Sequence, residues 1–368
     1  MATMEDIAKK LSLSKGTVSK ALNGAPDISE ATRKSVLEAA VELGYSRLVR
    51  SGSSRRLCIM IEHMAYQKPD DFGTDMVLGF RKMAEPAGYQ VDVTAFPEDL
   101  QKECSYDAYM MEHNYSGAFF LGIGSSEPWI KEFEACRTPT VLYDCPTYGN
   151  PLVTSVGIDS QEGMNLAVAW LKSLGHERIG YLGGEPRAYI FGVRRAAFFQ
   201  ALQSNGLKAD RKMSGTAYHS SDCLERHFRR LYEGGCTAII CSHDLLSSSL
   251  LTYCTESGIR VPEDLSIIGV DDIPLCRYTN PPLATIRQNR LDLGKCAFNA
   301  LSSLLAGVPL SSCLLHAELV RRASVGAPNL QRKPLESREY TAGGGEVGAL
   351  CLPAEEEAAG AAAPQSVS

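Results

Sequence analysis

Residues 14–23 carry side chains that could read double-stranded DNA. Lysine ammonium groups donate to guanine O6 and N7 in the major groove, and Lys15 and Lys20 are the candidates for this contact. Gly16 has no side chain, so it would allow a close approach without reading a base. Further candidates would contact phosphates and fix the register, namely Ser14, Thr17, Ser19 and Asn23. Outside a DNA-binding motif, the two lysines would instead be solvated surface charges.

The surrounding pattern predicts three short helices that would position these residues. Thr3, Ser14 and Ser29 can each cap the start of one helix. Asn23-Gly24 and Gly44 tolerate the left-handed conformation at a helix end. The apolar faces are Met4, Ile7, Ala8 and Leu11, then Val18, Ala21 and Leu22, then Val36, Leu37, Ala40 and Leu43. Two helices joined by a tight turn form a helix-turn-helix, whose second helix lies in the major groove.

Beyond residue 56, short apolar runs alternate with helical stretches, which predicts parallel sheets covered by helices on both faces. The expected strands are 57–61, 90–94, 117–121, 139–143, 178–182, 237–241 and 265–270. The expected helices are roughly 74–87, 161–174, 190–205, 222–233, 245–257 and 290–306. Because this stretch is too long for one sheet, we expect two α/β lobes.

Ligands of such lobes bind beyond the carboxyl ends of the strands, where Asp271 and Trp129 each follow an apolar run. The Asp271 carboxylate could accept hydrogen bonds from two vicinal hydroxyls. Trp129 could offer a ring face to a ligand, or it could pack the start of a helix.

The chain resembles the lactose/galactose-repressor (LacI/GalR) family of bacterial transcription regulators. The head carries this resemblance in residues 4–11, in residues 13–23 and in residues 36–45, and its most specific part is Thr17-Val18-Ser19-Lys20-Ala21-Leu22-Asn23. The body carries it in residues 156–184, 194–202, 237–244 and 260–288, and in all it covers about residues 3–328. The resemblance implies a two-lobed body like that of periplasmic sugar-binding proteins, with a ligand cleft between the lobes.

The resemblance also implies an effector site. Arg194 aligns with the family's effector-contacting arginine, and Phe72 and Tyr218 stand where family members place aromatic rings against the ligand. His243 stands where asparagine is usual, so effector preference would differ from that of the best-known members. Structural alternatives are a pairing of Arg194 with a surface carboxylate and a helix-capping or structural role for Asp272.

Residues 46–56 form a basic linker that departs from the family pattern. Family members carry Pro-Asn and then Ala-Arg-Ser-Leu, a segment that forms a hinge helix on DNA and wedges its leucine into the minor groove. Here Leu48-Val49-Arg50-Ser51 echoes this motif, but Gly52 stands where the leucine is expected. Leu48 is an alternative wedge and Arg50 a further DNA contact, and formation of a hinge helix stays open.

Charge and composition favour a DNA partner for the head. Residues 1–56 hold ten Lys and Arg against six Asp and Glu, whereas the whole chain has a net charge of −6, so polyanionic DNA would be drawn to the head. No apolar run approaches the ~20 residues of a membrane span, and no signal peptide is recognisable, so we expect a cytoplasmic protein without membrane contact. The twelve cysteines lack metal-ligand spacing, so we expect buried reduced thiols and no metal or cofactor.

We therefore expect a DNA-binding head at 1–45, a linker at 46–56, a two-lobed effector-binding and dimerisation body at 57–330, and a disordered Ala/Gly/Glu-rich tail at 331–368. Two chains would pair on a palindromic operator, and a small-molecule effector, a sugar or related metabolite, would alter that binding.

Two alternative functions are a two-lobed α/β enzyme and a sugar-binding protein, each with an accessory head. The sequence contains neither a GxGxxG nor a GxxxxGK[ST] motif, so it does not favour an enzyme that binds a dinucleotide or a nucleotide phosphate. Cys241-Ser242-His243-Asp244 holds nucleophile and base types, but neighbours on a strand face opposite ways, so we expect no triad there.

Overall fold

The computed structural model describes residues 2–45, 55–124, 127–145, 149–184 and 189–331. The predicted linker contacts Leu48 and Arg50, and the tail from residue 332 onward, lie outside these residues. Among the described residues, no helix is both long and apolar enough to cross a membrane. In the same part of the chain, eleven cysteines are free thiols, and eight of these are buried.

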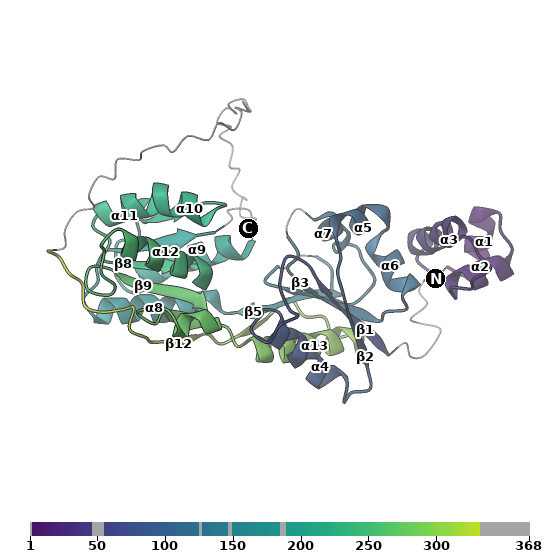
Figure 1. Ribbon diagram of the computed structural model, residues 1–368. Helices are drawn as coiled ribbons and strands as arrows, with labels where there is room; N and C mark the ends of the chain where they lie inside the picture. The colour runs from purple at the N-terminus through teal and green to yellow at the C-terminus, as the bar shows by residue number, and fades with distance from the viewer. Residues whose placement is uncertain (1, 46–54, 125–126, 146–148, 185–188, 332–368) are drawn as a thin grey trace, which may run out of the picture. The chain divides into compact units, whose positions relative to one another are not determined.

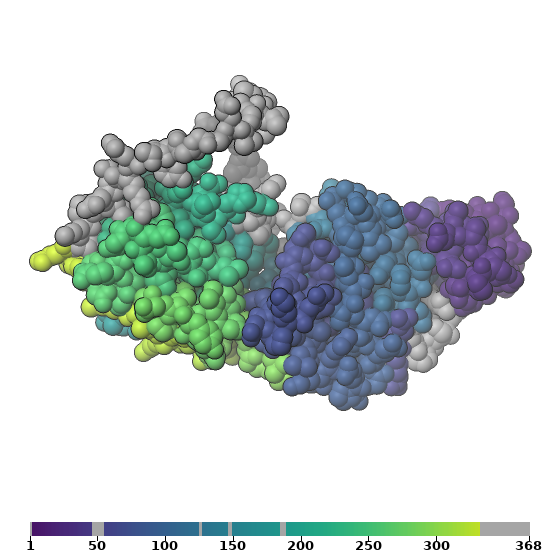
Figure 2. Space-filling view, in the orientation of Figure 1, coloured from purple at the N-terminus to yellow at the C-terminus, as the bar shows by residue number. Residues whose placement is uncertain are grey.

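The head consists of the three predicted helices, drawn in purple in Figures 1 and 2: α1 (Met4–Leu11), α2 (Lys15–Leu22) and α3 (Glu30–Leu43). All three predicted caps are present, because the side chains of Thr3, Ser14 and Ser29 accept hydrogen bonds from the backbone N–H groups three residues on. Gly44 ends α3 with φ 72°. At the end of α2, Gly24 takes the left-handed conformation and Asn23 does not.

The N-terminal lobe contains a six-stranded sheet in the order β11-β5-β4-β3-β1-β2, with every neighbouring pair parallel. Its strands are β1 (Arg56–Ile61), β2 (Gln90–Thr94), β3 (Gly117–Leu121), β4 (Thr140–Tyr143), β5 (Val153–Ile158) and β11 (Cys313–Leu315). Helices α4 (Thr74–Ala84) and α13 (Arg290–Leu305) pack together over one core. A second, aromatic core involves α5 (Glu98–Glu103), α6 (Tyr106–Glu112) and α7 (Pro128–Glu132).

The C-terminal lobe contains a second six-stranded sheet in the order β12-β10-β9-β8-β6-β7, in which only the β10–β12 pair is antiparallel. Its strands are β6 (Ile179–Gly183), β7 (Ser214–Thr216), β8 (Ala238–Cys241), β9 (Ser266–Asp271), β10 (Ala284–Arg287) and β12 (Glu318–Val320). Its main helices are α8 (Ser160–Ser173), α9 (Tyr189–Ser204), α11 (Arg229–Glu233) and α12 (Asp244–Glu256). The chain passes between the lobes after β5, after β10 and after β11.

The seven predicted strands are present, each within one residue of its expected bounds. The prediction missed β5, β7, β10, β11 and β12, which are short or interrupt their apolar residues with Thr, Ser, Gly or Arg. The helix expected over 222–233 is instead divided into α10 (Ser220–Asp222), a π-helical turn η2 (Cys223–Phe228) and α11. The doubly covered parallel architecture is as predicted, since the fold class depends on the alternation of elements more than on their number.

Candidate ligand cleft and nucleic-acid interface

A cavity of about 330 Å³, here called the ligand cleft, is lined by residues of both lobes. Asp144 follows β4, His243 follows β8, Asp271 ends β9 and Gln288 follows β10. All four therefore lie at carboxyl ends of strands, where open α/β sheets bind their ligands. Arg194 enters the cleft from α9.

The buried guanidinium of Arg194 lies between two carboxylates. Its Nη2 is 3.5 Å from Asp144 Oδ2, and its Nη1 is 3.6 Å from Asp271 Oδ1. Nη1 also donates to the Ser242 carbonyl oxygen at 2.7 Å. Since Asp144 belongs to the N-terminal lobe and Asp271 to the C-terminal lobe, this one side chain bridges the cleft. The predicted alternative of a surface pairing for Arg194 is wrong, because the side chains of the partner aspartates are only 8% and 15% exposed.

Burial disfavours the ionised form of both carboxylates. It raises the pKa of Asp144 to about 6, against the opposing influence of Arg194. Burial also raises the pKa of Asp271, while Arg194 and a hydrogen bond from Gln288 Nε2, at 2.6 Å, oppose that rise. Tyr143 Oη in turn donates to Gln288 Oε1 at 2.9 Å. With both carboxylates ionised, the three-residue group of Arg194, Asp144 and Asp271 carries one net negative charge.

The backbone of Asp271 is strained, because this residue has φ 120°, a region that residues other than glycine rarely occupy. Such strain persists only where the surrounding structure holds it, and it concentrates at functional sites. The strained backbone thus adds to the charge and burial of Asp271 as evidence for a ligand contact.

Aromatic rings form much of the remaining wall. The Phe72 ring lies 6.3 Å from the Tyr143 ring, and the Arg290 guanidinium lies over Phe72 at 5.3 Å. On the other side, Phe191 stacks on His243 with ring centroids 5.3 Å apart. Burial, followed by the nearby Arg194 charge, lowers the pKa of His243 to about 4, so this imidazole is neutral at pH 7.

We expected the side chains of Ser242 and His243 to face opposite ways, as neighbours on a strand do. Both residues instead follow the end of β8, and their side chains contact each other. Ser242 Oγ lies 2.9 Å from His243 Nδ1. The neighbouring Asp244 carboxylate instead accepts from Thr285 Oγ1 at 2.7 Å and from the Ile273 N–H at 3.0 Å. These three neighbouring side chains therefore do not form a nucleophile–base–acid relay.

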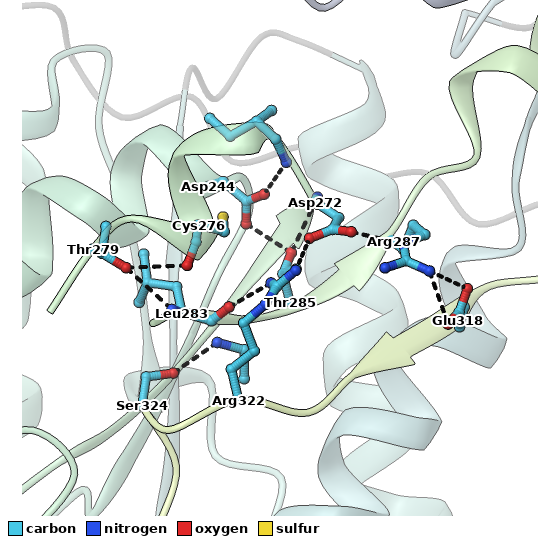
Figure 3. A network of polar contacts seen from close by, with 12 residues as sticks. Asp244, Asp272, Cys276, Thr279, Leu283, Thr285, Arg287, Glu318, Arg322 and Ser324 are labelled. Atoms are coloured by element: carbon cyan, nitrogen blue, oxygen red, sulfur yellow. Dashed lines mark hydrogen bonds and ion pairs between the residues drawn. The ribbon is translucent and has the colours of Figure 1, made fainter. Parts of the chain in front are cut away.

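Figure 3 shows a polar network around Asp272, the residue that directly follows β9 and Asp271. Asp272 accepts from Arg287 Nε at 2.7 Å and from Arg322 Nη2. Burial acts to raise the pKa of Asp272, but these two hydrogen bonds hold it below its usual value. The prediction of a structural role for Asp272 agrees with this geometry.

Four predicted effector residues line the ligand cleft: Phe72, Arg194, His243 and Asp271. Tyr218 lines a smaller neighbouring cavity of about 170 Å³, which shares Phe191 and His243 with the cleft. The prediction missed Asp144, Tyr143, Gln288 and Phe191. Asp144 directly follows an expected strand, so the reasoning that selected Asp271 could have found it as well.

Trp129 was wrongly predicted as an effector contact. Its side chain is fully buried in the aromatic core of the N-terminal lobe, against Phe96 and Tyr106, and its Nε1 donates to the Cys104 carbonyl at 3.0 Å. Trp129 is the second residue of the short helix α7, and its ring packs edge-on against Phe120 of β3. The alternative, packing at the start of a helix, is therefore the right one.

In the head, α2 buries Val18, Ala21 and Leu22 and exposes the opposite face. The side chains of Lys15 and Lys20 are 66% and 57% exposed, and their partners Glu5 and Asp27 are equally exposed. Solvent screens surface ion pairs of this kind, so both lysines could exchange these partners for DNA phosphates.

The polar DNA-contact candidates on α2 already make local hydrogen bonds. Ser14 Oγ lies 2.9 Å from Thr17 Oγ1, and Asn23 Nδ2 donates to the Ser19 carbonyl at 2.8 Å. A Cβ at Gly16 would meet only Ser14 Oγ, at 3.6 Å. Packing within the head therefore does not require glycine at position 16.

Comparison with known proteins identifies both parts of the chain. Residues 3–47 match the model described as "Bacterial regulatory proteins, lacI family", and residues 168–325 match the "Periplasmic binding protein-like domain". The chain is 30% identical over 336 residues to the HTH-type transcriptional repressor CytR of Escherichia coli (strain K12). The aligned region covers 89% of this chain and 97% of CytR. It is 29% identical over 335 residues to the HTH-type transcriptional repressor PurR of Aliivibrio salmonicida, and this alignment covers 88% of this chain and 99% of PurR.

Solved structures agree on the fold. The transcriptional regulator CelR–cellobiose complex superposes with a TM-score of 0.64 at 24% identity, covering 88% of this chain and 100% of that one. The Lac repressor dimer bound to operator and the anti-inducer ONPF superposes with a TM-score of 0.61 at 23% identity, covering 89% of this chain and 99% of the Lac repressor chain.

Proposed function

The chain belongs to the lacI family of bacterial regulatory proteins, and we propose that it is a repressor that binds a palindromic operator as a dimer and senses a sugar or related metabolite. The head supplies the DNA contacts through the exposed face of α2. The observation that carries the sensing proposal is the buried Arg194, held between a carboxylate of each lobe in the ligand cleft. A ligand that engages this group contacts both lobes and so changes how they close.

The charge of the cleft restricts the chemistry of the effector. Among the lining residues, the carboxylates of Asp144 and Asp271 outnumber the Arg194 guanidinium, which already bonds the Ser242 carbonyl and faces both carboxylates. The Arg290 guanidinium over Phe72 is paired with Asp75 at 3.4 Å. A phosphate or carboxylate ligand would meet net negative charge at low dielectric, which is costly. Hydroxyl groups, in contrast, donate to carboxylates, and neutral rings pack on Phe72 and Phe191. We infer an uncharged, hydroxyl-rich effector.

Regulation requires that the effector bind the two arrangements of the lobes with different affinity. A ratio of 5–150 between these affinities corresponds to about 1–3 kcal/mol of coupling, which is typical of allosteric proteins. The three chain crossings between the lobes are the segments that must bend. The first of them continues from β5 into α8, next to Asp159.

A thermal-shift screen of the full chain against sugars and nucleosides tests the sensing proposal, because a ligand that binds the folded state raises the melting temperature. Footprinting on upstream DNA, with and without the ligand found, then tests the regulation. We expect a protected palindrome whose occupancy changes with that ligand. Salt-sensitive operator binding that persists in a chain lacking residues 1–45 would contradict the role assigned to the head.

A further inference from the structure

A chain of hydrogen bonds runs from the end of β6 to the wall of the ligand cleft. The Gly184 N–H donates to Ser242 Oγ at 3.0 Å, and Ser242 Oγ lies 2.9 Å from His243 Nδ1. Ser242 is fully buried, whereas His243 lines both the ligand cleft and the neighbouring cavity of about 170 Å³. A Cβ at Gly184 would lie 2.8 Å from Phe191 Cε2 and 3.2 Å from His243 Cε1, so glycine leaves room for the two stacked rings.

The hydrogens in this chain can be placed by asking which atoms are able to accept them. Ser242 Oγ carries one hydrogen, and the Gly184 N–H can only donate to it. The buried Tyr181 hydroxyl lies beside Ser242 and has no other partner among the described residues. If Ser242 donates to His243 Nδ1, its oxygen can accept from Tyr181 as well, and every hydrogen has an acceptor. If Nδ1 carried the hydrogen instead, Ser242 would have to donate to Tyr181, whose own hydrogen would be left without an acceptor.

The imidazole of His243 therefore carries its hydrogen on Nε2, because a buried donor without an acceptor is costly. Burial, followed by the nearby Arg194 charge, lowers the pKa of His243 to about 4, so Nδ1 stays unprotonated at pH 7. In the part of the chain that the structure describes, Nε2 meets no partner and remains accessible from the cavities that the ring lines. His243 thus presents an N–H donor to a ligand.

Three other side-chain donors of the ligand cleft are already engaged. Arg194 Nη1 donates to a backbone carbonyl at 2.7 Å, and Gln288 Nε2 donates to Asp271 at 2.6 Å. Tyr143 Oη donates to Gln288 Oε1 at 2.9 Å. The carboxylates of the cleft require donors from the effector, whereas the N–H of His243 requires an acceptor. These opposite requirements together determine how an effector lies in the cleft.

We propose that Ser242 is a positioning residue that holds His243 as an N–H donor, and that the ligand cleft selects an uncharged effector with a hydrogen-bond acceptor at this wall. A carbonyl oxygen, a ring nitrogen or an ether oxygen supplies such an acceptor, and an ammonium group does not. This inference rests on the proposed function, in which hydroxyl groups of the same effector donate to the carboxylates of the cleft.

Nitrogen-15 NMR of the full chain, labelled in its histidines, tests the tautomer at pH 7 without any ligand. The signals that disappear in His243→Gln belong to His243, and we expect them to show a protonated Nε2 and an unprotonated Nδ1. Ser242→Ala removes the donor to Nδ1, so these signals should move toward a mixture of the two tautomers. Ser247→Ala is the matched control, because Ser247 Oγ bonds only the His243 carbonyl and not the ring, at 3.2 Å. A protonated Nδ1 in the wild-type chain, or signals that Ser242→Ala leaves unchanged, would overturn the role of Ser242.

Calorimetric titration of the full chain with glucose, galactose, ribose, cytidine and adenosine tests the selection of the effector. His243→Phe keeps a ring against Phe191 but has no N–H, so a probe that binds the wild-type chain should bind this variant about tenfold or more weakly. His243→Gln can place an amide N–H near the position of Nε2, so its affinity for that probe should stay within about threefold of wild type.

The remaining outcomes separate this inference from the proposed function. A probe that binds His243→Phe as tightly as the wild-type chain, or that His243→Gln loses as fully as His243→Phe, would overturn the selection of an acceptor. If no probe binds, the assignment of a sugar or related metabolite to the ligand cleft fails, and the selection of an acceptor fails with it. The NMR signals then still decide whether Ser242 fixes the tautomer of His243.

Discussion

At the scale of the residue, the neighbouring aspartates 271 and 272 have opposite roles. Asp271→Asn keeps the size of the side chain but removes the charge that faces Arg194 and accepts from Gln288. We expect the effector affinity to fall at least tenfold, about 1.4 kcal/mol, while operator affinity without effector is unchanged. Calorimetric titration and footprinting measure the two quantities.

Asp272→Asn is the matched control for this change. It breaks the pairing with Arg287 and Arg322, so we expect a lower melting temperature, with the effector-induced rise in melting temperature retained. If Asp271→Asn instead lowered stability and operator affinity together, Asp271 would be a folding residue and not a sensor.

Asp144 should make the stability of the chain depend on pH. Its pKa is about 6 in the folded chain and 3.8 as the ordinary value, so between these values the folded state binds more protons than the unfolded state. The contribution of Asp144 to the free energy of unfolding should therefore be largest below pH 4. It should decrease by up to about 3 kcal/mol as the pH rises from 4 through 6. Asp144→Asn should flatten this part of a denaturation profile measured from pH 4 to 8. A profile unchanged by Asp144→Asn, relative to the exposed control Asp70→Asn, would refute the assignment.

The sequence could identify individual cleft residues but not their partners. Asp271 was found because a carboxylate directly follows an apolar strand. Tyr143 and Gln288 were missed because their hydrogen bond joins segments 145 residues apart, and no local sequence pattern predicts a contact between such distant segments. The prediction that Trp129 contacts the effector was wrong for a related reason. Its position after a strand could be read from the sequence, but the direction of its side chain depends on how a short helix packs.

At the scale of the element, α2 should accept alanine at position 16 within the free protein. A Cβ there would make only an ordinary contact, so Gly16→Ala should stabilise the helix by up to about 1 kcal/mol. On the operator the added methyl group would occupy space that the DNA needs, so we expect operator affinity to fall. Gly192→Ala in α9, where a Cβ meets nothing within 4 Å, is the matched control and should stabilise without affecting operator affinity. Unchanged operator affinity in Gly16→Ala would contradict the predicted close approach of this residue.

The helices of the head were predictable because each carries its own signals, namely a Ser or Thr cap and an apolar face, and because a glycine follows α2 and α3. Strands β10 and β12 carry no such signal. Their pairing is fixed by contacts across the sheet, such as the bond from Arg287 to Glu318, and by the Asp272 network. The π-helical turn at 223–228 is likewise a tertiary feature, since the expected helical spacing runs through it without interruption.

At the scale of the whole molecule, operator binding by two heads requires that the bodies pair. Leu245, Leu275 and Tyr278 are among the exposed apolar side chains of the C-terminal lobe, with exposed fractions of 60%, 42% and 82%. The Ile273 N–H donates to Asp244, so the start of α12 lies beside the segment that carries Leu275 and Tyr278. We infer that these residues, here called the apolar patch, contribute to the interface with a second copy of the chain.

The double change Leu275→Asp and Tyr278→Asp tests this dimer and, with it, the requirement for two heads. Two buried, unpaired charges would oppose association, so we expect monomers in sedimentation analysis, with a melting temperature at low concentration close to that of the wild-type chain. Operator affinity should fall by an order of magnitude or more, because a single head covers only one half-site and buries little surface. Val308→Asp, at a residue 52% exposed and outside the apolar patch, should leave both the dimer and operator binding intact. Monomers that still bind the full operator with wild-type affinity would show that pairing of the bodies is not what brings the two heads to the DNA.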